Sequence, residues 1–148
     1  MPYQNISGAI QWSIIIPAYN EAARILPYLR NITSYMQDRG QPYEILVVDD
    51  GSTDATASVV ETFASSAPET QLLRAPLRRG KGAAVRRGMQ AAVGRLQLFT
   101  DADGATPIQE LTRLERLWQT EPTWRLDLAH SPRNCQATQS RPAGIEPF

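Results

Sequence analysis

The chain has 148 residues, 42% of them hydrophobic, and its 15 Lys and Arg balance 15 Asp and Glu, so the net charge is zero. This length and composition predict one soluble domain with a single core, and the balanced charge gives no general reason to expect a nucleic acid partner. The single cysteine, Cys135, and the single histidine, His130, exclude an internal disulfide and a Cys/His zinc cluster. Because the sequence shows neither a signal peptide nor a membrane-spanning run, we expect a cytoplasmic protein.

Short apolar runs alternate with amphipathic segments along most of the chain. After a polar leader over residues 1–11, the runs predicted as strands are residues 12–16, 43–48, 70–74 and 95–100. The segments predicted as helices are one that ends near Arg39, one that carries Val59, Val60 and Phe63, one over residues 80–93, and one that begins at Thr106. A fifth strand is predicted over residues 124–129, and the absence of periodicity in residues 131–148 indicates an irregular tail.

Several residues mark where these elements begin and end. Pro17 ends the first strand, Gly40 ends the first helix, and Ser52 or Asp54 can cap the second helix. The fourth helix begins in a capping box, Thr106-Pro107-Ile108-Gln109, with proline at the first helical position. The apolar residues of the first and fourth helices that we expect to face the core are Leu26, Leu29, Ile32, Met36, Ile108, Leu111, Leu114 and Leu117.

Four successive strand–helix repeats predict an α/β fold, in which a parallel sheet is covered by helices on both faces. In a doubly wound sheet of strand order 3-2-1-4, a ligand crevice opens between the carboxyl ends of the first and fourth strands. We therefore expect residues 14–16 to pair with residues 97–99. The loop after the first strand, residues 17–21, should then lie beside the loop after the fourth strand.

The loop after the fourth strand is acidic. If the chain is still extended at Asp101 and Asp103, these residues project to the same side, because extended residues alternate sides with period two. Paired carboxylates are typical ligands of Mg²⁺ or Mn²⁺, which take further ligands from substrate phosphates. Taken alone, Asp-x-Asp-Gly is more typical of an ordinary turn than of a metal site. The predicted sheet order favours a ligand site, since it brings Asp49 and Asp50 within one strand of this loop.

A basic segment lies between the second and fourth strands. Its cations are Arg74, Arg78, Arg79, Lys81, Arg86 and Arg87. Lys81 is the only lysine in the chain, and its position before the third helix indicates either a phosphate contact or a solvated helix face. The surrounding Gly80-Lys81-Gly82 is not a P-loop, because the earlier glycine and the Ser or Thr after the lysine are missing. The chain also lacks the G-x-G-x-x-G fingerprint of nicotinamide enzymes.

Four stretches of the sequence carry a family resemblance. In order, they are SIIIPAYNE, EILVVDDGSTDAT, RRGKGAAVRRGM and LFTDADGAT. They resemble the successive signatures of family-two glycosyltransferases, and the last two are most similar to those of dolichyl-phosphate β-glucosyltransferases and bacterial polyprenyl-phosphate relatives. The resemblance spans residues 12–118 and implies the GT-A fold, a Rossmann-like three-layer α/β/α architecture with a mainly parallel sheet, incomplete at the C-terminus. Residues 12–130 would be its nucleotide-sugar-binding part.

The resemblance also implies a set of site residues, position by position. The residues that would bind the nucleotide-sugar are Pro17, Ala18, Tyr19, Glu21, Asp49, Asp50, Lys81, Gly82, Asp101, Ala102 and Asp103. Asp101 and Asp103 would also hold Mg²⁺ or Mn²⁺. Asp103 and Lys81 would be the catalytic residues, because the metal held by Asp103 and the Lys81 ammonium would offset the charge of the departing diphosphate.

The function implied is transfer of glucose from UDP-glucose, with inversion, to a polyprenyl or dolichyl phosphate at the cytoplasmic face of a membrane, in the cell envelope. A phosphate acceptor needs no general base, and the carboxylates of Glu110, Glu115, Glu121 and Asp127 are weak candidates for one. The alternative is a truncated nucleotide-sugar-binding module without transfer. The acceptor half would be missing from 148 residues, and an uncovered edge would favour self-association into a homo-oligomer. A nucleotidyltransferase lacks support, since no glycine-rich loop follows the first strand.

Overall fold

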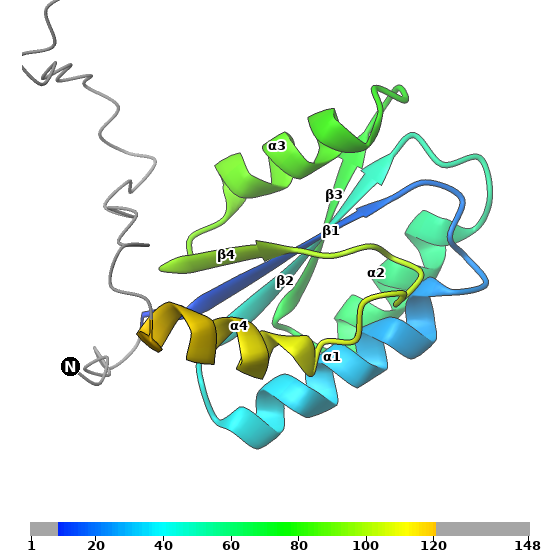
Figure 1. Cartoon of the computed structure of the whole chain (residues 1–148). Coiled ribbons are helices and arrows are strands. Elements are labelled where there is room, and N and C mark those ends of the chain that lie inside the picture. Colours follow the sequence, from blue (N-terminus) through cyan, green and yellow to red (C-terminus); the bar gives the residue numbers. More distant parts are fainter. Residues whose placement is uncertain (1–8, 121–148) are drawn as a thin grey trace, which may run out of the picture.

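The computed structural model describes residues 9–120, in which four strands alternate with four helices (Figure 1). The strands are β1 (Trp12–Ala18), β2 (Tyr43–Asp50), β3 (Thr70–Ala75) and β4 (Leu96–Phe99). The helices are α1 (Ile25–Arg39), α2 (Thr56–Ser66), α3 (Lys81–Ala91) and α4 (Glu110–Thr120). Figure 1 shows α3 on one side of the sheet and α1, α2 and α4 on the other, so the predicted three-layer α/β/α architecture is confirmed.

The strands form one parallel sheet in the order β3-β2-β1-β4, which confirms the predicted order. Ser13, Ile14 and Ile15 of β1 pair with residues 97, 98 and 99 of β4, so the two strands are neighbours as predicted but the register is shifted by one residue from the predicted pairing of residues 14–16. The direction of winding therefore reverses between β1 and β4, and the loops after these two strands meet at the same edge. This edge is where a ligand site is expected in an open α/β sheet.

The two central strands, β1 and β2, are buried along their whole length because helices cover both of their faces. Alternate residues of a strand point to opposite faces, and the core divides accordingly. Ile14 and Ile16 pack on the side of α1, α2 and the start of α4, whereas Ile15 packs on the side of α3. The continuous apolar run in the sequence reflects this burial on both sides.

Helix α3 lies very close to the sheet because its inner face consists of small residues, Ala84 and Gly88. A Cβ atom added at Gly88 would lie 2.4 Å from Ile15 Cγ2 and 3.0 Å from Val48 Cγ2. The chain after α3 is equally close, because a Cβ at Gly94 would lie 2.6 Å from the backbone nitrogen of Ser13. Small residues therefore fix how near this helix approaches β1 and β2.

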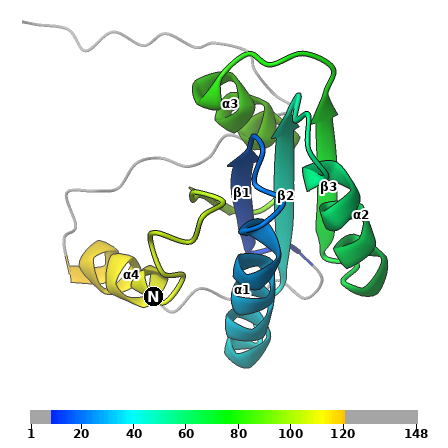
Figure 2. The same cartoon turned by 90° about the vertical axis from the view of Figure 1, so that its right-hand side faces the viewer.

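Figure 2 shows α4, α1 and α2 in this order along the opposite layer. Hydrogen bonds and one ion pair join α1 to α4. The Tyr35 hydroxyl lies 2.6 Å from Thr112 Oγ1, and Arg39 Nη2 lies 2.6 Å from the Glu115 carboxylate. Within the described residues, no helix is long and apolar enough to span a bilayer.

β1 and β2 both end two residues later than predicted, whereas the bounds of β3 and β4 differ by at most one residue. β1 continues through Pro17 to Ala18, although proline was expected to end it. Because β4 pairs with β1 only as far as Ile15, Pro17 has a neighbouring strand on the β2 side alone, and a proline is tolerated at such an edge position. Likewise, β2 continues to Asp50, so both Asp49 and Asp50 lie on a strand instead of in the loop.

Helix α4 also differs from its prediction. It begins at Glu110 instead of Pro107, because residues 107–109 form tighter turns in which each carbonyl accepts from the backbone N–H three residues later. Ile108 and Leu111 are buried as predicted, whereas Leu114 and Leu117 are 51% and 55% exposed. The predicted fifth strand, residues 124–129, and the tail, residues 131–148, lie outside the described residues.

Candidate functional site

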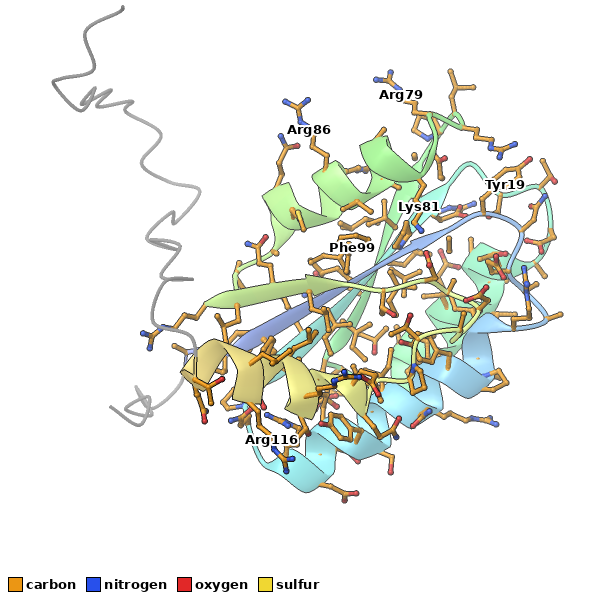
Figure 3. All side chains as sticks on the ribbon, viewed as in Figure 1. Tyr19, Arg79, Lys81, Arg86, Phe99 and Arg116 are labelled. Atoms are coloured by element: carbon orange, nitrogen blue, oxygen red, sulfur yellow. The ribbon has the colours of Figure 1, made fainter. Side chains whose placement is uncertain are left out.

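A pocket of about 260 Å³ opens at the carboxyl edge of the sheet, where the loops after β1 and β4 meet the start of α3. Its lining residues are Pro17, Ala18, Tyr19, Glu21, Asp50, Arg78, Gly80, Lys81, Ala84, Asp101, Ala102 and Asp103. In Figure 3, Tyr19 and Lys81 lie at this edge. A larger hollow of about 410 Å³ lies between α1 and α2, but its only charged lining residue is Arg30. Opposite charges gather only at the first of these two pockets, which we therefore take as the candidate site.

Hydrogen bonds join the loop after β1 to the loop after β2. Asn20 takes a left-handed conformation, with φ of 52°, and its Oδ1 accepts from the backbone N–H of Thr53 at 2.9 Å. In return, Ser52 Oγ accepts from the Asn20 N–H at 3.0 Å, and Thr56 Oγ1 accepts from the Glu21 N–H at 2.9 Å. These bonds hold the two residues that follow Tyr19 in place without a ligand.

Asp54 completes this junction and begins α2. Its carboxylate accepts from the backbone N–H of Ala22 at 3.2 Å and from that of Thr56, the first helical residue, at 2.9 Å. One of the two predicted caps, Asp54, therefore contacts the helix start, whereas Ser52 bonds to Asn20. The hydrogen bond from the Thr56 hydroxyl lowers the pKa of the Asp54 carboxyl. The ionised carboxylate therefore stabilises the folded chain fully above the usual carboxyl pKa, and this contribution is lost as pH falls through the lowered pKa.

The Asp50 carboxylate holds the basic loop before α3. Its Oδ1 accepts from the backbone N–H of Arg79 and its Oδ2 from that of Gly80, both at 2.8 Å, and the residue is only 4% exposed. Gly51 makes this approach possible, because its φ is 72° and a Cβ atom there would lie 2.7 Å from the Arg78 nitrogen. Asp50 therefore brings a segment nearly thirty residues away onto the pocket rim.

Arg78 reaches Tyr19 across the pocket. Its guanidinium carbon lies 3.8 Å from the centroid of the Tyr19 ring, which is a close cation–π contact. One face of the aromatic ring is therefore covered by a planar cation from the opposite loop. The loops after β1 and β3 thus meet through a flat, positively charged stack beside the pocket.

The acidic loop after β4 is a turn, so the prediction of an extended backbone at Asp101 and Asp103 is wrong. The chain bends at Ala102 and Asp103, and Gly104 has a left-handed φ of 69°. β4 has already ended at Phe99, so no neighbouring strand keeps this segment extended. Both carboxylates nevertheless line the pocket.

Tyr28 of α1 holds this turn from below. Its hydroxyl lies 2.7 Å from Thr100 Oγ1 and donates to the Thr106 carbonyl at 3.0 Å, so it ties both ends of the turn to α1. Burial raises the pKa of the Tyr28 hydroxyl, which therefore stays protonated and remains a donor at neutral pH. A Cβ at Gly104 would lie 3.0 Å from the Tyr28 ring, so the ring and the turn are closely matched.

An ion pair crosses the pocket mouth between Lys81 Nζ at the start of α3 and Asp101 Oδ1. Both side chains are about half exposed, at 57% and 47%, so solvent screens the pair. Asp103 is exposed, and its Oδ1 accepts from the Ala105 N–H at 2.9 Å. The basic and acidic loops therefore face one another across a small, water-accessible gap.

The donor set of the acidic turn fits one hard divalent cation. Asp101 and Asp103 each use one carboxylate oxygen in the contacts above, which leaves a second oxygen on each for a metal. Nowhere in residues 9–120 do three carboxylate, histidine or cysteine side chains gather at one point. A cation held here would therefore take its remaining ligands from water or from phosphates, as Mg²⁺ and Mn²⁺ commonly do.

The structure brings together most, but not all, of the predicted site residues. All of them line the pocket except Asp49 and Gly82. Asp49 is 2% exposed, and its Oδ1 accepts from the Ser52 N–H at 3.3 Å, as in a turn. Gly82 lies in the first turn of α3 with open space around it.

Sequence reasoning missed some residues of the site. The pocket adds Arg78, Gly80 and Ala84 to the predicted set, and Tyr28 supports it from α1. The only sequence signal for the first three was the run of basic residues and glycines around Lys81. Nothing in the sequence singled out Tyr28, whose spacing is simply that of a core-facing helical residue.

The chain is an α/β protein with an open parallel sheet and charged loops at the switch point, which is where proteins of this class bind their ligands. The family model described as "Glycosyl transferase family 2" matches residues 13–124. The chain belongs to this family, and the resemblance read from the four sequence blocks is confirmed.

Three dolichyl-phosphate beta-glucosyltransferases illustrate the relationship. The one from Drosophila melanogaster is 40% identical over 90% of this chain and 45% of its own length. The one from Trichomonas vaginalis is 43% identical over 70% of this chain and 32% of its own length. The human one is 34% identical over 72% of this chain and 35% of its own length. The chain thus spans between about a third and just under half of these relatives.

Solved structures agree with this assignment. The mannosyltransferase PcManGT from Pyrobaculum calidifontis, in complex with GDP-Man and Mn²⁺, superposes with a TM-score of 0.63 and 34% identity, over 78% of this chain and 34% of its own. The S. aureus TarS fragment in complex with UDP-GlcNAc gives a TM-score of 0.56 and 26% identity, over 64% of this chain and 27% of its own. The chain therefore has the GT-A fold over the part of that fold which it spans.

Proposed function

We propose that this chain is the donor-binding part of a glycosyltransferase that moves glucose from UDP-glucose to a polyprenyl or dolichyl phosphate. The observation that carries the proposal is the pocket at the switch point. There, an aromatic residue, Tyr19, a cation, Lys81, and two carboxylates, Asp101 and Asp103, share one small cavity. A nucleotide-sugar offers an aromatic base, a ribose and a diphosphate, which these chemical groups complement. The named activities of the relatives support glucose and a lipid phosphate as the substrates.

The proposed roles of the residues follow the order of the loops. Pro17, Ala18, Tyr19 and Glu21 after β1 would contact the base and ribose, with Asp49 and Asp50 at the end of β2. Lys81 and Gly82 would lie along the diphosphate, because α3 begins there and its N-terminus carries free backbone N–H groups. Asp101, Ala102 and Asp103 would complete the ribose and diphosphate contacts.

Asp101 and Asp103 would hold Mg²⁺ or Mn²⁺ against the diphosphate. When bound, such an ion neutralises charge on the leaving group and acts as a Lewis acid. The complexes of two structural neighbours contain Mn²⁺, which supports the choice of metal. The Lys81–Asp101 ion pair orients both side chains toward the same region before any ligand enters.

The reaction itself is a displacement at the anomeric carbon. A phosphate oxygen of the acceptor forms the new C–O bond from one side while the C–O bond to the diphosphate breaks on the other, which inverts the configuration. The bonding electrons leave with UDP, and Lys81 is placed to offset the charge that then develops. An acceptor phosphate is anionic at neutral pH, so no residue has to remove a proton from it.

The surroundings of the pocket are consistent with an acceptor of this kind. Of the carboxylates first considered as bases, Glu115 is held by Arg39 at 2.6 Å, and Glu110 is paired with Arg113 on the surface of α4. Glu121 and Asp127 lie outside the described residues. A sugar hydroxyl acceptor would require a general base. The carboxylates that line the pocket are held by other groups: Glu21 by Arg24, Asp50 by the loop before α3, Asp101 by Lys81 and Asp103 by the Ala105 N–H. We accordingly propose that the protein acts at the cytoplasmic face of a membrane.

The alternative function is a nucleotide-sugar-binding module without transferase activity. The observation that favours it is coverage, because the chain spans less than half of the length of the relatives quoted above. The site described here belongs to the donor, and the acceptor wall would have to come from other residues. Donor binding and sugar transfer are therefore separate expectations for this chain.

Calorimetric titration followed by a transfer assay separates these two expectations. With Mn²⁺, UDP-glucose should bind with a dissociation constant in the micromolar-to-millimolar range, about −8 to −4 kcal/mol, and more tightly than GDP-mannose or UDP-N-acetylglucosamine. The purified chain alone should then form no glucosyl polyprenyl phosphate. Robust transfer would show that the chain suffices for catalysis, whereas preferred binding of GDP-mannose would overturn the proposed donor.

A further inference from the structure

Charge is distributed very unevenly in this neutral chain. Residues 70–100 contain seven of its 15 Lys and Arg and no Asp or Glu, so all 15 acidic residues lie outside this segment. The segment comprises β3, the loop after it, α3 and β4. This part of the fold therefore carries a surplus of cations, although Arg74 pairs with Glu61 and Lys81 with Asp101.

The fold turns several of these cations outward. Ala84 and Gly88 face the sheet, so the opposite face of α3 carries the exposed Arg86. Arg87 is also exposed but lies at the flank of the helix, where its guanidinium donates to the Arg74 carbonyl of β3 at 2.7 Å. Figure 3 shows Arg79, in the loop before α3, and Arg86 pointing away from the sheet on the same side of the molecule, whereas Arg116 lies across the molecule on α4. Neither Arg79 nor Arg86 lines the pocket.

An exposed apolar residue lies next to these arginines. Leu77 is 69% exposed. The other exposed large apolar residues in the described part of the chain, Val93, Leu117, Leu114 and Phe99, are each less exposed. Its loop is not loose, because Asp50 binds the N–H groups of Arg79 and Gly80, and Gly51 lies against the backbone of residues 77 and 78. A firmly held loop thus presents one leucine to solvent among cations.

We propose that this basic face, defined by Leu77, Arg78, Arg79, Arg86 and Arg87, docks on the anionic phospholipid surface of a bilayer. Clusters of four to eight basic residues beside an apolar side chain are typical of such contacts, because the arginines meet lipid phosphates and the apolar group enters the interface. A nucleic acid would match the charge but offers no apolar layer for Leu77. The five residues that define the basic face include no aromatic side chain to stack on bases, and the neighbouring Tyr19 ring contacts Arg78 and lines the pocket.

Membrane docking through the basic face would serve the proposed transfer to a lipid phosphate, and its biological meaning rests on that proposed function. Arg78 belongs both to the basic face and to the pocket lining, and Lys81 follows it at the pocket mouth. Contact with a bilayer through this face would therefore bring the pocket rim close to the membrane surface, where a lipid phosphate acceptor has its head group. The contact itself depends only on charge and on Leu77, so it can be tested without any nucleotide.

The test is sedimentation of the purified chain with vesicles of phosphatidylcholine, with and without phosphatidylglycerol. We expect binding to the anionic vesicles only, weakened by high salt because surface charges are screened. The double substitution R79E/R86E should weaken binding by at least about twentyfold, since each arginine near an anionic surface is worth about fivefold. Leu77→Ser should weaken binding at both low and high salt, because it removes the apolar contact.

The matched control is R113E/R116E, which makes the same change in net charge on the exposed face of α4. It should bind vesicles as the unaltered chain does, apart from a small general effect of charge. UDP-glucose affinity should be equal in both double variants, so a failure of nucleotide binding leaves the vesicle result interpretable. Equal binding to neutral vesicles, or equal losses in both double variants, would overturn the proposal. Tighter, Arg79- and Arg86-dependent binding of a single-stranded oligonucleotide would reassign the face to nucleic acid and would also overturn it.

Discussion

Asp103→Asn is expected to remove the Mn²⁺-dependent part of UDP binding, with a loss of at least about tenfold to a hundredfold in affinity. The substitution replaces one of the two carboxylates at the acidic turn with a neutral amide of the same shape. Folding should be preserved, because Asp103 is exposed and the amide oxygen can still accept from the Ala105 N–H. Calorimetry with and without Mn²⁺ measures the loss, and a thermal melt measures the stability.

Asp38→Asn provides the control, since Asp38 is an exposed aspartate in the last turn of α1 and does not line the pocket. It makes the same chemical change on the surface of the same domain. Its UDP affinity should match that of the unaltered chain at every Mn²⁺ concentration. If a folded D103N variant kept its full Mn²⁺-dependent affinity, Asp103 would be an ordinary turn residue and no metal ligand.

Gly88→Ala is expected to destabilise the fold by about 1–3 kcal/mol, although alanine is the better helix former. The new methyl group would lie 2.4 Å from Ile15 Cγ2 and 3.0 Å from Val48 Cγ2, both within the buried core beneath α3. Either α3 moves away from the sheet or these side chains leave their preferred rotamers. Such a loss is a large part of the stability of a typical domain, and a shift of the urea midpoint at unchanged slope measures it.

Gly82→Ala in the same helix separates packing from helix propensity. A Cβ atom at Gly82 has no neighbour within 4 Å, so this substitution should be neutral or stabilising by up to about 1 kcal/mol. The urea midpoint should therefore fall in the Gly88→Ala variant and stay the same or rise in the Gly82→Ala variant. Equal shifts would mean that α3 is free to move and does not fix the position of Lys81 at the pocket.

The sheet and the meeting of the loops were predictable because they depend on patterns that extend along the whole chain. Alternating strands and helices require a parallel sheet, and the order 3-2-1-4 then places the loops after β1 and β4 side by side. The sheet order predicted that the loop after β1 lies beside the acidic turn, and the family resemblance added Lys81 to the same site. The four ordered sequence blocks narrowed the family further than any single motif could.

Local backbone geometry was less predictable. The turn at Asp101 and Asp103 depends on Gly104 and on Tyr28, a residue more than seventy positions earlier. Similarly, the role of Asp50 depends on a loop nearly thirty residues away, and Arg78 is placed by its contact with Tyr19. These are contacts between individual residues far apart in the chain, and the hydrophobic periodicity of the sequence does not predict such contacts. In α4, the spacing of the apolar residues predicted correctly which of them share one face of the helix. It did not predict that only the first part of this face would be buried against α1 and the sheet.

The most direct test of the central claim is to locate the metal and the nucleotide on the chain in solution. Addition of Mn²⁺ with UDP-glucose to isotope-labelled protein broadens the amide signals of residues near the paramagnetic ion. We predict that the signals of residues 101–104 and of Lys81 broaden first, and that those of Arg30 and Thr62, in the hollow between α1 and α2, stay sharp. Broadening centred on that hollow, or unchanged signals at residues 101–104, would contradict the assignment of the donor site.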